Sequence, residues 1–164
     1  MKNLLPLFFL GITFTVRAQV NSVLPAEANT FYNTAMQSIK PDIKSMIEKN
    51  ANKLKGRDVN TDSLCEELHK NELLKNINQH DLQALTVLIM VQVSKNADAD
   101  LKKLVTSMHK KPTEKTGYQD SSESSISENK VERILANKSQ IAENVSLVMK
   151  NLSGTTEMMI EQFK

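Results

Sequence analysis

Apolar residues recur at intervals of three and four along most of the chain, which is the spacing of one face of an α-helix. The most apolar stretch, 85–93, is hydrophobic on nearly every side, so a helix there is expected at the centre of the fold. Its β-branched residues would equally fit a buried strand. Because the helical spacing continues through Ala97, Leu101, Leu104 and Met108 without a turn signal, we predict one helix over 82–108, with Asp81 as its N-cap.

The same spacing predicts helix over 21–55, with a start near Pro25 and a stop at Gly56. Pro41 lies inside this range, and it either begins a second helix at its own first turn or kinks one long helix. Since the hydrophobic phase continues across Pro41, we expect two nearly collinear segments.

A short helix is predicted next, from a capping box that begins at Ser63. The neighbouring side chains of Asn60, Thr61 and Asp62 compete with Ser63 as the N-cap. We expect this helix to continue through Leu68 to the apolar residues Leu73, Leu74 and Ile77.

The last helix is predicted to begin at a second capping box, Ser125 to Glu128, after a mobile Ser-rich linker at about 110–127. Its apolar stripe has heptad spacing and is interrupted only by Lys138; the stripe consists of Val131, Ile134, Ile141, Val145, Val148 and Leu152. Gly154 is expected to end or bend this helix before a short apolar end segment.

These segments predict an all-α fold, a bundle of four to five amphipathic helices in a single domain over 19–164. The heptad phase favours shallow helix crossings of about twenty degrees. Glycines and aromatic residues are scarce after residue 18. Sandwiches and barrels need many turns and aromatic strand positions, and α/β enzymes need glycine-rich turns, so both classes are disfavoured.

Residues 1–18 have the pattern of a cleaved signal peptide. A positive start containing Lys2 precedes an apolar run over 4–16, and Ala18 precedes the expected cut before Gln19. The apolar run is too short to span a bilayer, so an uncleaved anchor is disfavoured. We therefore expect an exported protein, periplasmic or extracellular and of bacterial origin, that does not associate with the membrane after cleavage.

Removal of the signal peptide changes the charge balance. The chain has 21 Lys and Arg against 19 Asp and Glu, and cleavage would remove Lys2 and Arg17 but no acid, which leaves 19 against 19. A nucleic-acid binder usually shows a basic excess, and so does a protein held on an anionic membrane surface. We expect neither partner for the mature chain.

Cys65 is the only cysteine, so it cannot form a disulfide within the chain. Cys65 and His69 are four residues apart on one helix face, with Glu66 and His80 near in sequence, and they could supply part of a zinc site. A cysteine nucleophile would need a base from His69, His80 or His109, and nothing in the sequence assembles one. We assign no catalytic, cofactor-binding or metal-binding residue and expect a buried Cys65 in a protein that is not an enzyme.

Two further patterns resemble ligand or modification sites. Asn96, Asp98 and Asp100 alternate as calcium ligands do, but they lack the glycine and the final Glu of the calcium loop, which favours a solvated helix face. Three N-glycosylation sequons begin at residues 137, 144 and 151. Their seven-residue spacing follows equally from a heptad with Asn on its polar side, which is the interpretation we prefer.

The sequence thus predicts a helical protein that acts through protein–protein contacts, either with a second copy of itself or with another helical protein. The alternative is a carrier of a small ligand or a metal, with a pocket between helices. A pocket lined by Val87, Met90 and Met149 would favour this carrier. The methionines follow the apolar stripes, however, and this spacing favours a role in filling the core.

Overall fold

The computed structural model describes the backbone of residues 23–110 and 121–152, and the side chains of 23–107 and 128–152. These residues form five α-helices, one short 3-10 helix and no strand, which confirms the predicted all-α class. The signal peptide, the apolar end segment and the middle of the expected linker lie outside the described residues. The export signal therefore stays a prediction.

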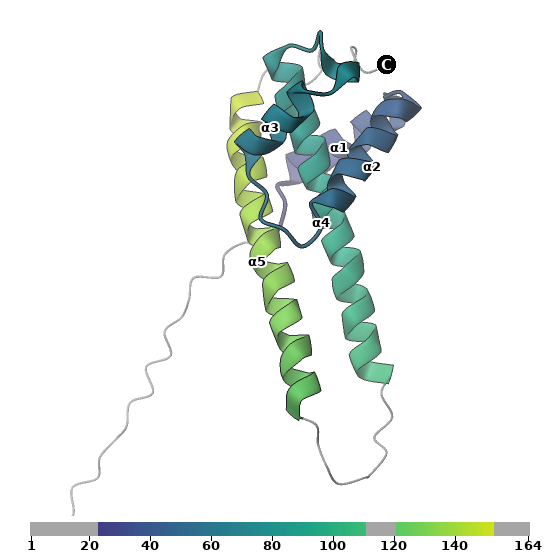
Figure 1. Cartoon of the computed structure of the whole chain (residues 1–164), viewed down its shortest axis with the longest axis vertical. Helices are drawn as coiled ribbons and strands as arrows, with labels where there is room; N and C mark the ends of the chain where they lie inside the picture. Colours follow the sequence, from purple (N-terminus) through teal and green to yellow (C-terminus); the bar gives the residue numbers. More distant parts are fainter. Residues whose placement is uncertain (1–22, 111–120, 153–164) are drawn as a thin grey trace, which may run out of the picture.

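Two long antiparallel helices form the axis of the molecule: α4 (Gln79–Lys110) and α5 (Ser121–Leu152) lie side by side along it. Figure 1 shows three shorter helices around their upper halves: α1 (Ala26–Ser38) behind, with α2 (Pro41–Lys53) and α3 (Thr61–His69) in front. This upper part, residues 23–97 and 139–152, is called the head below. The lower halves of α4 and α5, residues 98–110 and 121–138, project from it and are called the distal hairpin.

The central position of α4 follows from its sequence, as predicted. Nearly every side chain from Leu82 to Ser94 is buried, including Leu85, Ile89 and Met90 at 0% exposure. The single helix over this range confirms the helical interpretation of its β-branched residues. Because this stretch is apolar on all sides, it needs neighbours on all sides, and α1, α2, α3 and α5 each contact it.

Pro41 begins a second helix rather than kinking one long helix. Ile39 and Lys40 have extended backbone conformations, and Pro41 occupies the first turn of α2, where its missing N–H costs no hydrogen bond. Figure 1 shows α1 passing behind α2. The prediction that the two helices are nearly collinear is therefore wrong. Two extended residues are enough to change the direction of the chain, whatever the hydrophobic phase on either side.

Helix starts differ from those predicted at two places, and at a third the structure selects one of the competing N-caps. Asn60 caps α3, because its Oδ1 accepts from the Ser63 N–H at 2.9 Å. Asn78 caps the start of α4 in the same way, accepting from the Asp81 N–H at 2.8 Å. α5 begins at Ser121, within the range expected to be a linker and four residues before the predicted capping box. The sequence contains an earlier acidic pair with capping-box spacing, at residues 120 and 123, which favours the earlier start.

α3 also ends sooner than expected. It stops at His69, and the apolar residues that were predicted to continue it form a separate 3-10 helix, η1 (Glu72–Leu74). Asn71 separates the two, since its Oδ1 accepts from the Leu73 N–H at 3.1 Å. An asparagine that binds the backbone two residues ahead forms a turn in place of a continuous helix.

A row of polar side chains links three helices within the head. The Tyr32 hydroxyl on α1 donates to Gln92 on α4, whose Nε2 donates to Asn96 at 2.9 Å, and Asn96 in turn donates to Asn52 on α2 at 3.2 Å. Lys95 lies 5.0 Å from the centre of the Tyr32 ring, within cation–π range. These contacts fix α1 and α2 at defined positions along α4, where apolar packing alone would allow them to slide.

Candidate functional site

Cys65 and His69 lie on one face of α3, as their spacing predicts. Both line an open cavity of about 610 Å³ beside α4 and α5, together with Glu66. Cys65 is half-buried, and its Sγ lies 3.2 Å from the Thr86 hydroxyl oxygen. His80 is exposed at the start of α4 and does not line this cavity.

Within the described ranges, no three His, Cys, Asp or Glu side chains are close enough to hold a metal ion. His109, the third candidate base for a cysteine nucleophile, has no described side chain. The geometry around Cys65 is therefore a thiol hydrogen-bonded to a core threonine, at the edge of a cavity that only one histidine lines.

The calcium-like residues of α4 are directed to three different neighbours. Asn96 binds Asn52 of α2, Asp98 pairs with Lys138 of α5, and the Asp100 carboxylate lies 2.7 Å from Lys55 Nζ. Successive positions two apart on a helix point in different directions, so the three oxygens do not converge on one point. The face is partly solvated, as expected, since the Asp98 side chain is 58% exposed. Its side chains also bond to α2, to the loop after α2 and to α5.

Lys138, the one polar interruption of the α5 stripe, has a role in this pairing. Its side chain is only 13% exposed, and its ammonium group reaches Asp98 on α4. This ion pair lies at the junction of the head and the distal hairpin. It therefore holds α4 and α5 together at the point where the head ends.

In the described part of the chain, Val87, Met90 and Met149 do not line the pocket that would favour a small-ligand carrier. Val87 and Met90 are 0% exposed within the core, and Met149 packs against the same core. Their apolar side chains fill the space between helices. This agrees with the core-filling role that the spacing of Met90 and Met149 favours. The sequence alone did not exclude a pocket, because core residues and pocket residues share the same periodicity and composition.

Two of the sequon asparagines fix a loop that the sequence did not predict. The loop over 54–60 joins α2 to α3 and crosses in front of the α4–α5 pair (Figure 1). Asn144 Nδ2 donates to the Val59 carbonyl at 2.8 Å, and Asn137 Nδ2 donates to the Arg57 carbonyl at 3.5 Å. Seven residues are about two helical turns, so both side chains leave the same face of α5.

A third donor extends this row toward the tip of α5. Arg133 Nη2 donates to the Gly56 carbonyl at 3.2 Å, and Gly56 adopts a positive φ of 69° that ends the turn after α2. Val59, 1% exposed, anchors the other end of the loop in the core. The available signals in the sequence were Gly56 and the heptad of asparagines, but neither identifies its partner.

The distal hairpin has an inner seam and an exposed outer face. Leu101 and Leu104 of α4 and Val131 and Ile134 of α5 are half-buried along the seam. Two apolar residues come directly after seam residues: Leu135 follows Ile134 on α5, and Val105 follows Leu104 on α4. Their side chains are 42% and 45% exposed. In antiparallel helices, positions that follow the seam by one lie on the same face of the pair.

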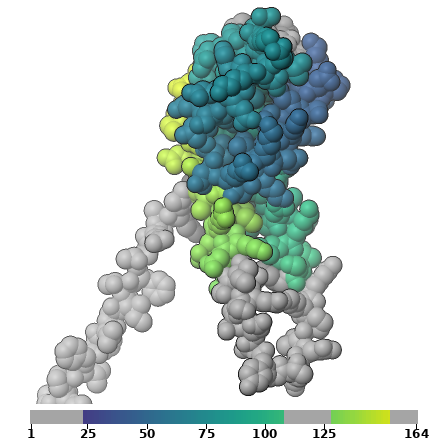
Figure 2. All heavy atoms as spheres, in the orientation of Figure 1, coloured from purple at the N-terminus to yellow at the C-terminus, as the bar shows by residue number. Residues whose placement is uncertain are grey.

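The loop lies on the opposite face of the α4–α5 pair. The residues that bind it each precede a heptad position of the α5 stripe by one: Arg133 precedes Ile134, Asn144 precedes Val145, and Asn137 precedes Lys138, the polar interruption of the stripe. Leu135 and Val105 therefore point away from the loop, on what is called the outer face below. Figure 2 shows the hairpin extending as a narrow projection below the head.

Comparison with known proteins adds no name to this geometry: no protein-family model, no curated protein and no solved structure matches the chain. None of the helices in the described ranges is both long enough and apolar enough to cross a membrane.

Proposed function

We propose that this chain is an exported, non-enzymatic helical protein that acts through protein–protein contacts, and that the distal hairpin provides the contact surface. The observation that carries the proposal is that Leu135 and Val105, two exposed apolar side chains, share the outer face of a part of the molecule that projects from the core. The signal-peptide pattern of residues 1–18 supports export.

The partner proposed for this surface is the hairpin of a second copy. Two helices bury only one seam between them, whereas two paired hairpins form a four-helix arrangement that buries both outer faces. The described stretches of the hairpin, 98–107 and 128–138, have four acids and five bases. Because acids and bases nearly balance, like-charge repulsion between two paired hairpins is small.

Native mass spectrometry and analytical ultracentrifugation of residues 19–164 test this proposal. The wild-type protein is expected to form a dimer in the micromolar range. Leu135→Glu places a charge in the contact and is expected to weaken dimerisation at least tenfold. Leu147→Glu is the matched control, because Leu147 is on the same helix and is 55% exposed but precedes a stripe residue, on the opposite face.

The measurement has two outcomes against the proposal. A wild-type protein that stays monomeric at every concentration would show that the outer face does not bind a second copy. Equal weakening by Leu135→Glu and Leu147→Glu would show that the dimer contact lies elsewhere or that added charge acts non-specifically. Dimer loss confined to Leu135→Glu is the supporting result.

A further inference from the structure

A cavity of about 560 Å³ lies under the loop that crosses the α4–α5 pair. Its apolar floor consists of Val93 and Ala97 of α4 and Ile134 of α5, which is the upper end of the hairpin seam. The loop and the end of α2 form its polar rim, and Asn137, one of the residues that fix the loop, lines it as well. The volume is within the range of small-molecule sites.

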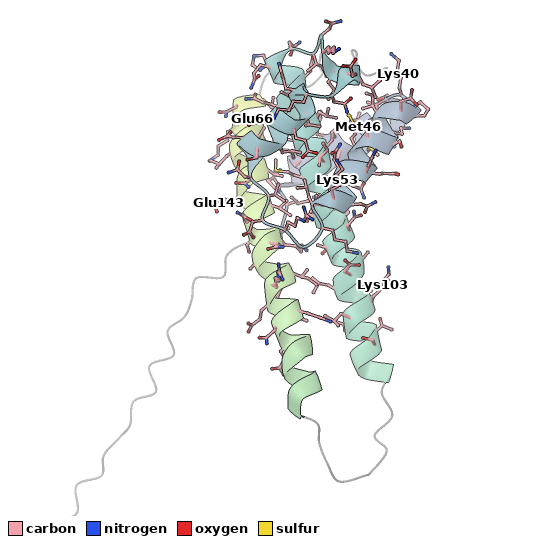
Figure 3. The ribbon with its side chains drawn as sticks, viewed as in Figure 1. Lys40, Met46, Lys53, Glu66, Lys103 and Glu143 are labelled. Atoms are coloured by element: carbon pink, nitrogen blue, oxygen red, sulfur yellow. The ribbon has the colours of Figure 1, made fainter. Side chains whose placement is uncertain are left out.

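The rim of the cavity contains basic side chains that are paired with carboxylates and one that is not. Lys53 pairs with Glu67 at 3.1 Å, and Lys55 pairs with Asp100 at 2.7 Å. Figure 3 places Lys53 near the end of α2, where the loop begins. These two lysines therefore add little net charge to the rim, and the remaining positive charge there belongs to arginine.

Arg57 lines the cavity, and within the described part of the chain no carboxylate lies within ion-pair distance of it. Arg133 has the same property, since its described contact is the hydrogen bond to the Gly56 carbonyl. Arg133 is next to Ile134 of the floor and binds the loop residue that precedes Arg57. Asp100 also lines the cavity, but its carboxylate is paired with Lys55. Arg57 is thus the lining guanidinium without a described carboxylate partner, and Arg133 holds the backbone of the loop next to it without lining the cavity itself.

This combination has a defined chemical preference. A guanidinium group presents a planar fork of N–H donors that matches the two oxygens of a carboxylate or of a phosphate. The apolar floor adds burial for a short hydrocarbon part of the same molecule, at a few tens of calories per mole for each Å² removed from water. Neither a neutral apolar molecule nor a free inorganic anion would use both features.

We propose that this loop cavity is a binding site for a small amphiphilic anion, in which a carboxylate or a phosphate lies at Arg57 and a short apolar chain lies on Ala97 and Ile134. The site is separate from the outer face of the hairpin, because the loop is on the opposite face. Binding and self-association can therefore be tested independently.

Isothermal titration calorimetry with four named probes tests the proposal: hexanoate, hexyl phosphate, hexanol and inorganic phosphate. At least one of the two anionic hexyl probes is expected to bind with one-to-one stoichiometry, and the tighter one identifies the preferred head group. Hexanol and inorganic phosphate are each expected to bind at least tenfold more weakly, because each lacks one half of the interaction.

Arg57→Gln removes the charge but keeps a polar side chain at an exposed position, so the variant is expected to fold. It should weaken binding of the anionic hexyl probes about tenfold without changing that of hexanol. Lys103→Gln removes one positive charge from an exposed position on the projecting part of α4, outside the cavity, and should leave all affinities unchanged.

Three results would overturn the proposal. One is the absence of saturable binding by either anionic hexyl probe. Another is binding of hexanol or inorganic phosphate as tight as that of the anionic hexyl probes, which would show that only one half of the site is used. The last is an equal loss of affinity for the anionic hexyl probes in Arg57→Gln and Lys103→Gln, which would show that binding depends only on the net charge of the protein.

Discussion

Asp81 is a buried carboxyl group in the first turn of the central helix. It is 3% exposed, and its Oδ2 has no hydrogen-bond partner among the described residues. Burial raises the pKa of Asp81, while the hydrogen bond with Asn78 and the nearby His80 oppose that rise. A helix start favours a negative charge, but the lost hydration of the carboxylate is the larger effect here.

We predict that Asp81→Asn stabilises the protein by about 1 kcal/mol at neutral pH, because it removes the buried negative charge and keeps a side chain of the same shape. Because the folded-state pKa is above the unfolded one, the unfolded state loses its proton first as the pH rises, and the wild type becomes less stable. The advantage of the variant should therefore disappear below about pH 4, near the unfolded pKa.

Urea unfolding of both proteins between pH 4 and 8 measures this difference. A gain that is the same at every pH would mean that the Asp81 charge does not contribute. His80→Gln provides a control, because it removes a neighbour that opposes the rise in the pKa of Asp81, and it should therefore raise that pKa further.

At the scale of elements, the loop over 54–60 depends on α5 for its position. We predict that Asn144→Ala destabilises the protein by about 1 kcal/mol, because the carbonyl of the buried Val59 loses its donor. Asn151→Ala is the matched control: the residue is one heptad further along α5, belongs to the same kind of sequon and is exposed. Thermal unfolding of both variants checks the difference, and equal effects would contradict a role for the Val59 contact.

Helices with a long and regular hydrophobic pattern could be predicted from the sequence, but the residues at which the helices begin and end could not. The helix through Leu85 and Leu104 is continuous because its spacing is unbroken. At the start of α3, by contrast, Asn60 and Ser63 are both good caps whose energies differ by a few tenths of a kcal/mol. Such a small difference is decided by the surrounding packing, which a local pattern does not contain.

The arrangement of the candidate sites shows the same limit. The shared face of Cys65 and His69 follows from their spacing alone. The contact between Asn144 and Val59 joins residues 85 positions apart, and that between Arg133 and Gly56 joins residues 77 apart. A periodic pattern assigns a residue to a face, but it does not say which distant segment will cover that face, so the loop cavity could not be predicted.

At the scale of the whole molecule, stability is expected to be concentrated in the head. We predict that Ile89→Ala, at a site with 0% exposure, costs about 3 kcal/mol, whereas Leu104→Ala in the half-buried seam costs about 1 kcal/mol. In hydrogen exchange, amides over 84–94 should exchange only through global unfolding, and those over 101–107 through local opening. Uniform protection along α4 would contradict this division.

The seam that joins the two projecting halves of α4 and α5 repeats every seven residues, and the head does not depend on how many repeats follow it. Insertion of one heptad into each helix would move the tip outward by about 10 Å while every contact of the head stays in register. If the distal hairpin is the contact surface, as proposed, its reach is therefore adjustable in discrete steps without any change in the core.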